Sequence, residues 1–355
     1  MSDVVTEWRE RIRAAAAKQT PLRIVGGGTK DFYGQELYGD RFDTGAHRGV
    51  VDYDPTELVI TARCGTPLAA IEAALDAERQ MLAFEPPHFG HNATLGGCVA
   101  AGLSGPRRAY CGAVRDVVLG VRLLDGRGDD LSFGGRVMKN VAGFDVSRLI
   151  AGSLGTLGVI VEVSLKCLPR PAAETTLEFA MEQEEALRKL NEWGAQPLPL
   201  SASCWYRDRL RVRLSGAASA IAGAARRLGG DTMADAATFW ADLREQRHAF
   251  FADPGATLWR ASVSSTAPQP GVGGDACIEW GGALRWFNVG TADDGARLRA
   301  WARANGGHAT MFRAADKSAG AFQPLPPALL GVHQRLKAQF DPAGVLNPRR
   351  MYAEF

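Results

Sequence analysis

The chain has 355 residues, 41 of them glycine, and a formal net charge of +2 at pH 7. This length is sufficient for two domains with a hydrophobic core each, and the small net charge, with scattered basic residues, argues against a nucleic-acid partner. The absence of any C-x-x-C pair argues against an iron–sulfur cluster or a zinc site; the six cysteines are Cys64, Cys98, Cys111, Cys167, Cys204 and Cys277.

No apolar stretch is long enough to span a bilayer. The best candidate, residues 149–165, is interrupted by glycines, serines and Glu162, whereas a spanning helix needs about 20 apolar residues. The N-terminal end is polar and does not resemble a signal peptide. We therefore expect no transmembrane segment, no disulfide framework and a cytoplasmic protein, unless a partner tethers it.

The first predicted elements are a helix and a strand that ends in glycines. Residues 7–18 predict a helix with Trp8 and Ile12 on one side, and residues 24–30 read Ile-Val-Gly-Gly-Gly-Thr-Lys. Glycine adopts positive φ without steric cost, and successive amide N–H groups in such a turn form an anion site. A tight turn without a ligand fits the stretch equally well.

The next segments alternate between strand and helix. Residues 58–63 predict a strand, and Thr66 with Pro67 predicts a helix start in which Thr66 is the N-cap. Residues 93–105 are almost all small. Such a segment is either a close-packed backbone crossing or a wall against a flat ligand.

A hairpin and a third glycine cluster follow. Residues 117–124 alternate and end in Asp-Gly, which predicts a hairpin onto residues 131–133. The cluster at residues 151–158 leads into a strand that runs through Leu165. The proline-rich stretch 168–171 then predicts a domain boundary.

Beyond this boundary the pattern changes to a second region. Residues 182–193 and 217–228 predict helices, residues 210–214 predict a strand, and residues 267–274 form a flexible stretch rich in proline and glycine.

The glycine clusters resemble those of the flavoprotein superfamily that includes vanillyl-alcohol oxidase and p-cresol methylhydroxylase (PCMH). Residues 26–30, 94–97 and 152–158 carry the resemblance, and the other matching pieces are residues 116–120, 139–140, 143–145 and 341–348. The resemblance implies an α+β fold, with a bipartite PCMH-type FAD-binding domain and a smaller α/β cap domain. We expect the FAD-binding domain at 1–170, the cap at 171–320, and a C-terminal segment, 321–355, that returns to the FAD domain.

The same resemblance implies which residues bind FAD. In the family the first glycine loop holds the pyrophosphate, and the other two segments run along the rest of the cofactor. The residues implied are Val25, Gly26, Gly27, Gly28, Thr29, Lys30, Thr94, Leu95, Gly96, Gly97, Ala101, Gly102, Gly105, Asp116, Gly152, Gly155, Thr156, Gly158, Val159, Ile160 and Asn347. Relatives with covalent flavin usually have a histidine in or beside the first loop; here none precedes His47, so we expect non-covalent FAD.

A second resemblance, to the E subunits of bacterial glycolate oxidase, covers essentially the whole chain. It rests on residues 53–61, 85–88, 281–286, 306–310 and 350–354. It implies the FAD-binding subunit of a glycolate dehydrogenase complex, which oxidises glycolate, a 2-hydroxy acid, to glyoxylate and passes electrons to an iron–sulfur subunit and a quinone. The implied partners are that subunit and a sister FAD-binding catalytic subunit. The implied location is cytoplasmic, peripheral on the inner face of the cytoplasmic membrane through the complex.

Oxidation of a 2-hydroxy acid needs a base for the hydroxyl group and a cation for the carboxylate. Our candidates for these catalytic roles are His308 and Arg285, ahead of His88, His91 and Arg313. A packed histidine, or an arginine stacked on the surrounding aromatic residues, fits the sequence as well. The sister D subunits carry clustered histidines with a glutamate that suit a metal ion, and this chain shows no such cluster, so we predict no metal site.

Several functions stay open at this point. The chain transfers the hydride itself, or the sister subunit does so and this chain is a structural or electron-relaying flavoprotein without its own substrate site. The missing metal cluster favours the second. A free-standing FAD-dependent dehydrogenase of another 2-hydroxy acid, such as D-lactate, is a further alternative. The intact glycine loops argue against a scaffold that has lost its cofactor.

Overall fold

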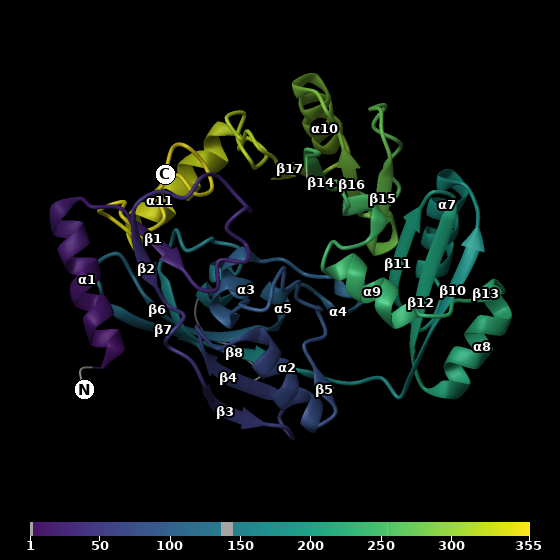
Figure 1. The fold of residues 1–355 in the computed structure, drawn as a ribbon, viewed down its shortest axis with the longest axis horizontal. Helices are drawn as coiled ribbons and strands as arrows, with labels where there is room; N and C mark the ends of the chain where they lie inside the picture. Colours follow the sequence, from purple (N-terminus) through teal and green to yellow (C-terminus); the bar gives the residue numbers. More distant parts are fainter. Residues whose placement is uncertain (1–2, 136–144, 254) are drawn as a thin grey trace.

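Two antiparallel sheets organise the molecule (Figure 1). The computed structural model describes residues 3–135, 145–253 and 255–355, so the 139–140 and 143–144 pieces of the first resemblance lie outside the described residues. The first sheet has five strands in the order β3-β4-β8-β6-β7. They are β3 (Val50–Asp54), β4 (Val59–Arg63), β8 (Val159–Lys166), β6 (Val118–Leu124) and β7 (Asp130–Gly134).

Helices and two short ladders surround this first sheet. Helix α3 contacts β8 and β4, and α6 contacts β6 and β7. The helices are α1 (Val4–Lys18), α2 (Leu68–Ala77), α3 (Leu95–Ala101), α4 (Arg108–Cys111), α5 (Val114–Val117) and α6 (Val146–Ile150). Strands β1 (Leu22–Val25) and β2 (Asp40–Asp43) pair in parallel, and β5 (Gln80–Met81) pairs with β9 (Leu168–Pro169).

The second sheet has eight strands in the order β13-β10-β12-β11-β15-β16-β14-β17. They are β10 (Ala173–Ala180), β11 (Leu200–Tyr206), β12 (Arg209–Gly216), β13 (Asp231–Thr232), β14 (Leu258–Ser262), β15 (Ala276–Glu279), β16 (Leu284–Asn288) and β17 (His308–Arg313). The helices of this region are α7 (Gln183–Gly194), α8 (Ala218–Leu228), α9 (Ala236–Arg244) and α10 (Ala292–Ala304), with two 3₁₀ turns, η1 (Ala249–Phe251) and η2 (Trp280–Gly282).

The two faces of the eight-stranded sheet have different neighbours. Helices α7, α8 and α10 contact its strands, and side chains such as Trp259 and Phe287 pack on their side. Because side chains alternate along a strand, the neighbouring residues Leu258 and Trp286 point to the opposite face and pack with α9 and with Leu103 of the first region. Figure 1 shows α9 between the two sheets. The second face is therefore turned toward the first region.

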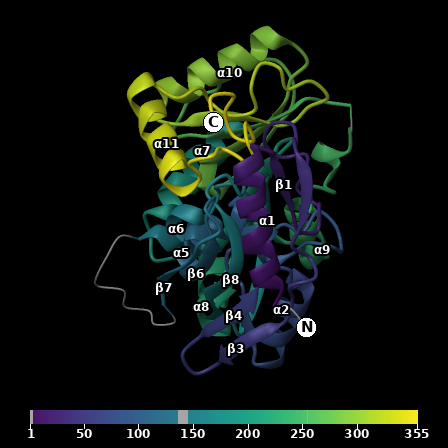
Figure 2. The ribbon, with the colours of Figure 1, turned by 90° about the vertical axis from the view of Figure 1, so that its left-hand side faces the viewer.

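The C-terminal segment returns to the first region. Helix α11 (Pro327–Phe340) contributes Leu336 and Phe340 to the core around the first sheet, and both views place it on the side of the molecule that carries α1 (Figures 1 and 2). The amide of Leu22 donates to the Val345 carbonyl over 2.7 Å, and the amide of Asn347 donates to the Leu22 carbonyl over 2.9 Å. The tail thus lies beside β1.

The structure confirms most of the predicted elements and corrects some. The hairpin of β6 and β7, helices α7 and α8, and strands β4, β8 and β12 form as expected, whereas α1 begins at Val4 rather than at residue 7. The predicted cap at Thr66 is wrong: Pro67 is the N-cap of α2 and makes no side-chain cap bond. The Thr66 hydroxyl instead accepts a hydrogen bond from the Gly49 amide over 2.9 Å, because a competing backbone donor lies within its reach.

Candidate functional site

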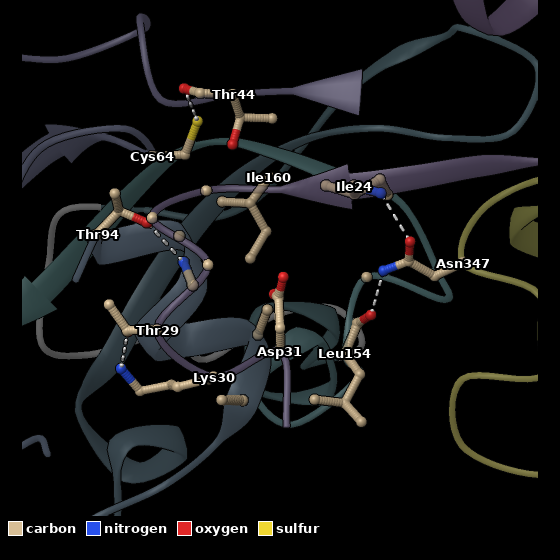
Figure 3. A pocket seen from close by; sticks show the side chains of 18 of the residues that line it. Ile24, Thr29, Lys30, Asp31, Thr44, Cys64, Thr94, Leu154, Ile160 and Asn347 are labelled. Atoms are coloured by element: carbon tan, nitrogen blue, oxygen red, sulfur yellow. Dashed lines mark hydrogen bonds between the residues drawn. The ribbon is translucent and has the colours of Figure 1, made fainter. Parts of the chain in front are cut away.

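A cavity of about 100 Å³ lies where β1, α3, the start of β8 and the C-terminal tail meet. Figure 3 shows the glycine loop after β1 curving through it, with Lys30 at one end and Thr44 and Cys64 at the other. The lining residues are Ile24, Gly26, Gly27, Gly28, Thr29, Lys30, Asp31, Leu37, Thr44, Cys64, Thr94, Gly96, Gly97, Ala100, Ala101, Leu154, Gly155, Gly158, Ile160, Asn347 and Arg350.

The glycine loop presents a row of unused backbone donors. Within the described residues, the N–H groups of residues 26–30 donate to no protein acceptor. Gly28 has a φ of +72°, a conformation that glycine adopts without cost. A Cβ at Gly27 would lie 1.6 Å from the Asn92 carbonyl oxygen, so a larger residue there would displace the loop itself. Several free amides in one concavity form an anion site.

Two cations lie at this cavity. Lys30 Nζ donates to Thr29 Oγ1 over 3.3 Å and to the His88 carbonyl over 3.2 Å, and burial lowers the pKa of Lys30. The Arg350 guanidinium donates to the carbonyls of Asp31 and Gln35, and burial lowers its pKa to about 10. An ammonium and a guanidinium both favour anionic ligands.

The tail completes the cavity through Asn347. Its Oδ1 accepts from the Ile24 amide over 2.7 Å, and its Nδ2 donates to the Leu154 carbonyl over 2.6 Å (Figure 3). Asn347 and Arg349 have φ values of 40° and 60°. Arg349, which stands where the related tails usually have glycine, thus takes the left-handed conformation that glycine favours.

Most of the residues expected to bind the cofactor line this one cavity. Three of the others, Val25, Leu95 and Val159, are core residues that do not line this cavity, and their assignment to the cofactor stays a prediction. Thr156 is also buried, and its hydroxyl donates to the Ser153 carbonyl. Residues of the cavity that the sequence did not indicate are Ile24, Asp31, Leu37, Thr44, Cys64, Ala100, Leu154 and Arg350.

The remaining expected positions also lie outside this cavity, each for its own reason. Gly102 and Gly152 allow two backbones to cross, since a Cβ on Gly102 would lie 2.7 Å from the Gly152 Cα. Asp116 is exposed and accepts a hydrogen bond from the Ala113 amide over 2.8 Å at the start of α5. Gly105 lines a second cavity.

This second cavity, of about 30 Å³, lies between the eight-stranded sheet and the first region. From the sheet come Arg260 of β14, Glu279 of β15, Trp286 of β16 and Phe312 of β17. The first region contributes two segments to the cavity, with the residues Pro87, Phe89, Leu103, Ser104, Gly105 and Pro106. The cavity therefore brings two arginines, Arg244 and Arg260, and one carboxyl group together between the two halves of the molecule; Arg244 Nε donates to Glu245 Oε1 over 2.8 Å.

Glu279 is the carboxyl group that lines this second cavity, and its pKa is raised. Trp286 Nε1 donates to Glu279 Oε1 over 2.7 Å. Burial raises the pKa of Glu279 to about 7, although the Trp286 hydrogen bond and the charge of Arg260 act in the opposite direction. A carboxyl group with a pKa near neutrality in a cavity is typical of functional sites. Arg260 and Glu279 carry no sequence motif, and only the alternation along β14 and β15 would have placed them on this face.

The two catalytic candidates occupy different faces of the sheet. Arg285 is fully buried on the helix-covered face, and its guanidinium donates to the carbonyls of Gly282, Ala267 and Pro268. Its donors are therefore used within the protein, which corrects its assignment as the carboxylate-binding cation. His308, at the start of β17, shares the face of Phe312; partial burial and the charges of Arg260 and Arg108 lower its pKa.

The weaker candidates are engaged elsewhere or exposed. His88 Nε2 lies 3.2 Å from Glu72 Oε2, and Arg313 donates to Gln246 Oε1 over 2.8 Å. His91 is exposed. Among the described residues no group of three histidine, cysteine or acidic side chains could hold a metal ion, and none of the described helices has the length and apolar character needed to cross a membrane.

Comparisons with known proteins indicate the family to which this chain belongs. Residues 4–134 match the family described as FAD binding domain. The chain is 51% identical over 345 residues to "Glycolate oxidase subunit GlcE" of Escherichia coli (strain K12), a match that covers 97% of this chain and 96% of that protein. The chain belongs to the GlcE family. As a GlcE-family protein with an FAD binding domain, it has FAD as its cofactor.

More distant relatives of this GlcE-family chain cover only part of it. "Glycolate oxidase subunit GlcD" of Bacillus subtilis (strain 168) is 31% identical over 138 residues, which is 39% of this chain and 29% of that protein. A solved structure of alkyldihydroxyacetonephosphate synthase shares the fold, with a TM-score of 0.65 and 16% identity over 96% of this chain and 75% of that one. The mixed fold of a PCMH-type FAD-binding protein is thereby confirmed.

Proposed function

We propose that this chain is the FAD-binding subunit of a complex that oxidises glycolate to glyoxylate. The observation that carries the proposal is the row of free amides at residues 26–30, in a chain 51% identical to a glycolate oxidase subunit over nearly its whole length. The other relatives include D-lactate and D-2-hydroxyglutarate dehydrogenases, which also act on 2-hydroxy acids.

The residues of the larger cavity suit FAD. The amides of residues 26–30 and the Lys30 ammonium would hold the diphosphate, since both favour negative charge. The Asp31 carboxylate also lines this cavity, and it would accept hydrogen bonds from ribose hydroxyl groups. When bound, FAD supplies a two-electron acceptor. His47 packs against Trp8 and does not line the cavity, which supports non-covalent binding.

The proposed partners are a sister FAD-binding subunit and an iron–sulfur subunit, with a quinone as the final acceptor. Membership of the GlcE family supports this assembly. We also propose that the complex is cytoplasmic and peripheral on the inner face of the cytoplasmic membrane, where it would meet the quinone.

We propose domains at 1–170 and 171–320, with a C-terminal segment at 321–355 that belongs to the first. In support, the strands of the five-stranded sheet lie between residues 50 and 166, and those of the eight-stranded sheet lie between residues 173 and 313. The contact of α11 with the first core supports the return of the tail.

Lys30→Met tests the cofactor site without changing the glycine loop. Loss of a hydrogen bond to a charged group costs roughly 1.5–3 kcal/mol, so we expect the Kd for FAD, from flavin fluorescence, to rise about tenfold or more. The matched control is Lys189→Met, which removes an ammonium from the surface of α7. Equal Kd values for the two variants would contradict the assignment of Lys30.

A second measurement tests the reaction. The FAD-loaded chain, assembled with its two partner subunits, is mixed with glycolate under anaerobic conditions, and the visible flavin band is followed. Loss of the band together with formation of glyoxylate supports the proposed function. An unchanged band that dithionite still bleaches contradicts it.

A further inference from the structure

We propose that the cavity between the two sheets is a 2-hydroxy-acid site of this chain itself, in which Arg260 binds the carboxylate and Glu279 accepts the hydroxyl proton. This inference rests on the proposed function and deepens it. It assigns substrate binding to this subunit, whereas the missing metal cluster had favoured a subunit without a substrate site.

Arg260 is a half-buried cation that makes no ion pair with the described residues. Its Cζ lies 5.1 Å from the Trp280 ring centroid and 5.9 Å from the Trp286 ring centroid. Within the described residues its guanidinium makes no hydrogen bond and no ion pair, and burial lowers its pKa, although the charge of Glu279 acts in the opposite direction. Removing a charge from water without hydrogen bonds is costly, and a planar guanidinium matches a carboxylate with two parallel hydrogen bonds. A carboxylate ligand would supply the hydrogen-bond acceptors that the protein does not give this guanidinium.

A second arginine, Arg108, packs against the indole ring of Trp280. Arg108 Cζ lies 4.5 Å from the Trp280 ring centroid, and Trp280 Nε1 donates to the Gly105 carbonyl over 3.0 Å. Trp280 is therefore fixed to the first region while it contacts Arg260 on the sheet. The positive potential at this point comes from both halves of the molecule and favours an anion between them.

Glu279 is placed to act as the base. One of its carboxylate oxygens is held by Trp286, which leaves the other for a ligand. The charged groups that face it are Arg260 on β14 and Glu85 from the first region; burial raises its pKa to about 7. A base with a pKa near the working pH is the most effective.

The position of the cavity connects it to the cofactor site. A single segment, residues 94–106, lines the larger cavity with Thr94, Gly96 and Gly97 and the smaller one with Leu103 to Pro106. The helix within it, α3, has seven residues and so spans only about 10 Å. The smaller cavity is about 30 Å³, so an acid bound there must have few atoms.

The proposed step balances. The O–H proton of the acid moves to the free carboxylate oxygen of Glu279. The C–H bond at the carbon that carries this hydroxyl group would break, and its hydrogen would leave with the electron pair to a two-electron acceptor, which FAD would supply when bound. The C–O bond becomes C=O, so the 2-hydroxy acid is oxidised to a 2-oxo acid and the acceptor is reduced.

The binding test uses oxalate, which cannot be oxidised in this way, and the FAD-loaded full chain. Titration calorimetry at pH 8 in two buffers of different ionisation enthalpy reports both the Kd and proton uptake. We expect Arg260→Gln to raise the Kd about tenfold or more, and Arg260→Lys to restore part of the affinity. The matched control is Arg207→Gln, because Arg207 also stands on an aromatic ring, that of Tyr206, but pairs with Asp275 at the surface.

Proton uptake separates a base from a merely structural carboxyl group. An anion beside Glu279 raises the pKa of Glu279, so the wild-type chain should take up protons when oxalate binds. Glu279→Gln should bind oxalate at least as tightly and take up none. With glycolate in place of oxalate, this variant should slow bleaching of the flavin by about 10²–10⁴-fold.

The outcomes distinguish this inference from the proposed function. If the complex oxidises glycolate but Arg260→Gln and Glu279→Gln leave oxalate binding, proton uptake and bleaching unchanged, the inference is overturned and the proposed function stands. If the complex does not oxidise glycolate, the proposed function fails. The melting temperature of Arg260→Gln excludes misfolding as the cause of lost binding; we expect it to equal that of the wild-type chain or exceed it, because the half-buried Arg260 guanidinium makes no hydrogen bond or ion pair with the described residues.

Discussion

Lys337 allows the attachment of the C-terminal segment to be tested quantitatively. It lies in α11, is 5% exposed, and its ammonium donates to Asp341 Oδ2 over 2.6 Å and to the carbonyls of Thr156 and Leu346 over 2.8 and 2.7 Å. Breaking a buried ion pair on one side costs about 3–5 kcal/mol. Asp341 also accepts from the Leu346 amide over 2.7 Å, which would keep part of its charge satisfied. We therefore expect Lys337→Met to lower the free energy of unfolding by about 3 kcal/mol.

Urea unfolding followed by circular dichroism measures this loss. The matched control is Lys189→Met on α7, where the ammonium lies 3.8 Å from Glu192 Oε2 and the lysine side chain is 34% exposed. A surface pair of this kind contributes only about 0.3–0.5 kcal/mol. If both variants unfolded at the same urea concentration, the buried pair would not hold the tail, and our account of the C-terminal segment would be refuted.

Three further predictions concern the two cavities and the contact between the sheets. Asn347→Leu removes the side-chain hydrogen bonds to Ile24 of β1 and to the Leu154 carbonyl, so we expect weaker FAD binding by flavin fluorescence and a stability loss of roughly 1–3 kcal/mol; an unchanged Kd would contradict this. The raised pKa of Glu279, about 7 against 4.5, means that the folded protein holds this proton where the unfolded chain releases it. Stability should therefore fall by about 3 kcal/mol as pH rises from 4.5 through 7, and Glu279→Gln should remove that slope in urea titrations at several pH values. Arg213→Met loses the 2.7 Å contact with Glu85 across the two regions, and a loss of roughly 1.5–3 kcal/mol should appear in thermal unfolding; no change would show that this contact does not hold the regions together.

Local patterns in the sequence predicted much of the fold. The alternation in residues 117–124 and the Asp-Gly after it gave the hairpin of β6 and β7, because period-2 patterning and turn chemistry are local properties. The order of strands in the eight-stranded sheet could not be predicted from the sequence. Strand β11 pairs with β15 across a gap of about seventy residues, and such pairing depends on long-range packing. Thr66 was misassigned as a cap for the same reason, because its partner Gly49 is not a local neighbour.

The cofactor site was more accessible to sequence reasoning than the second cavity. Glycines and small residues at 26–28 and 94–97 are required by close backbone approaches, so they leave a visible pattern; a Cβ at Gly26 would lie 2.5 Å from Thr94 Oγ1. Neighbours of such motifs, such as Val25 and Leu95, do not line the cavity, because a motif does not state which side chains face inward; their assignment to FAD stays a prediction. The domain limits at 170 and 320 stay predictions.

The contrast between Arg285 and Arg260 follows from side-chain alternation. Both lie on adjacent strands, β16 and β14, and Arg260 pairs with Trp286, the residue next to Arg285. Because paired residues share a face and successive residues alternate, Arg260 must point toward the first region while Arg285 points toward α10. The aromatic neighbours that drew attention to Arg285 in the sequence are thus divided between two faces, and one of them, Trp286, belongs to the cavity of Arg260. Once the strand register is known, it shifts our proposal for the carboxylate-binding arginine from Arg285 on β16 to Arg260 on the neighbouring strand β14.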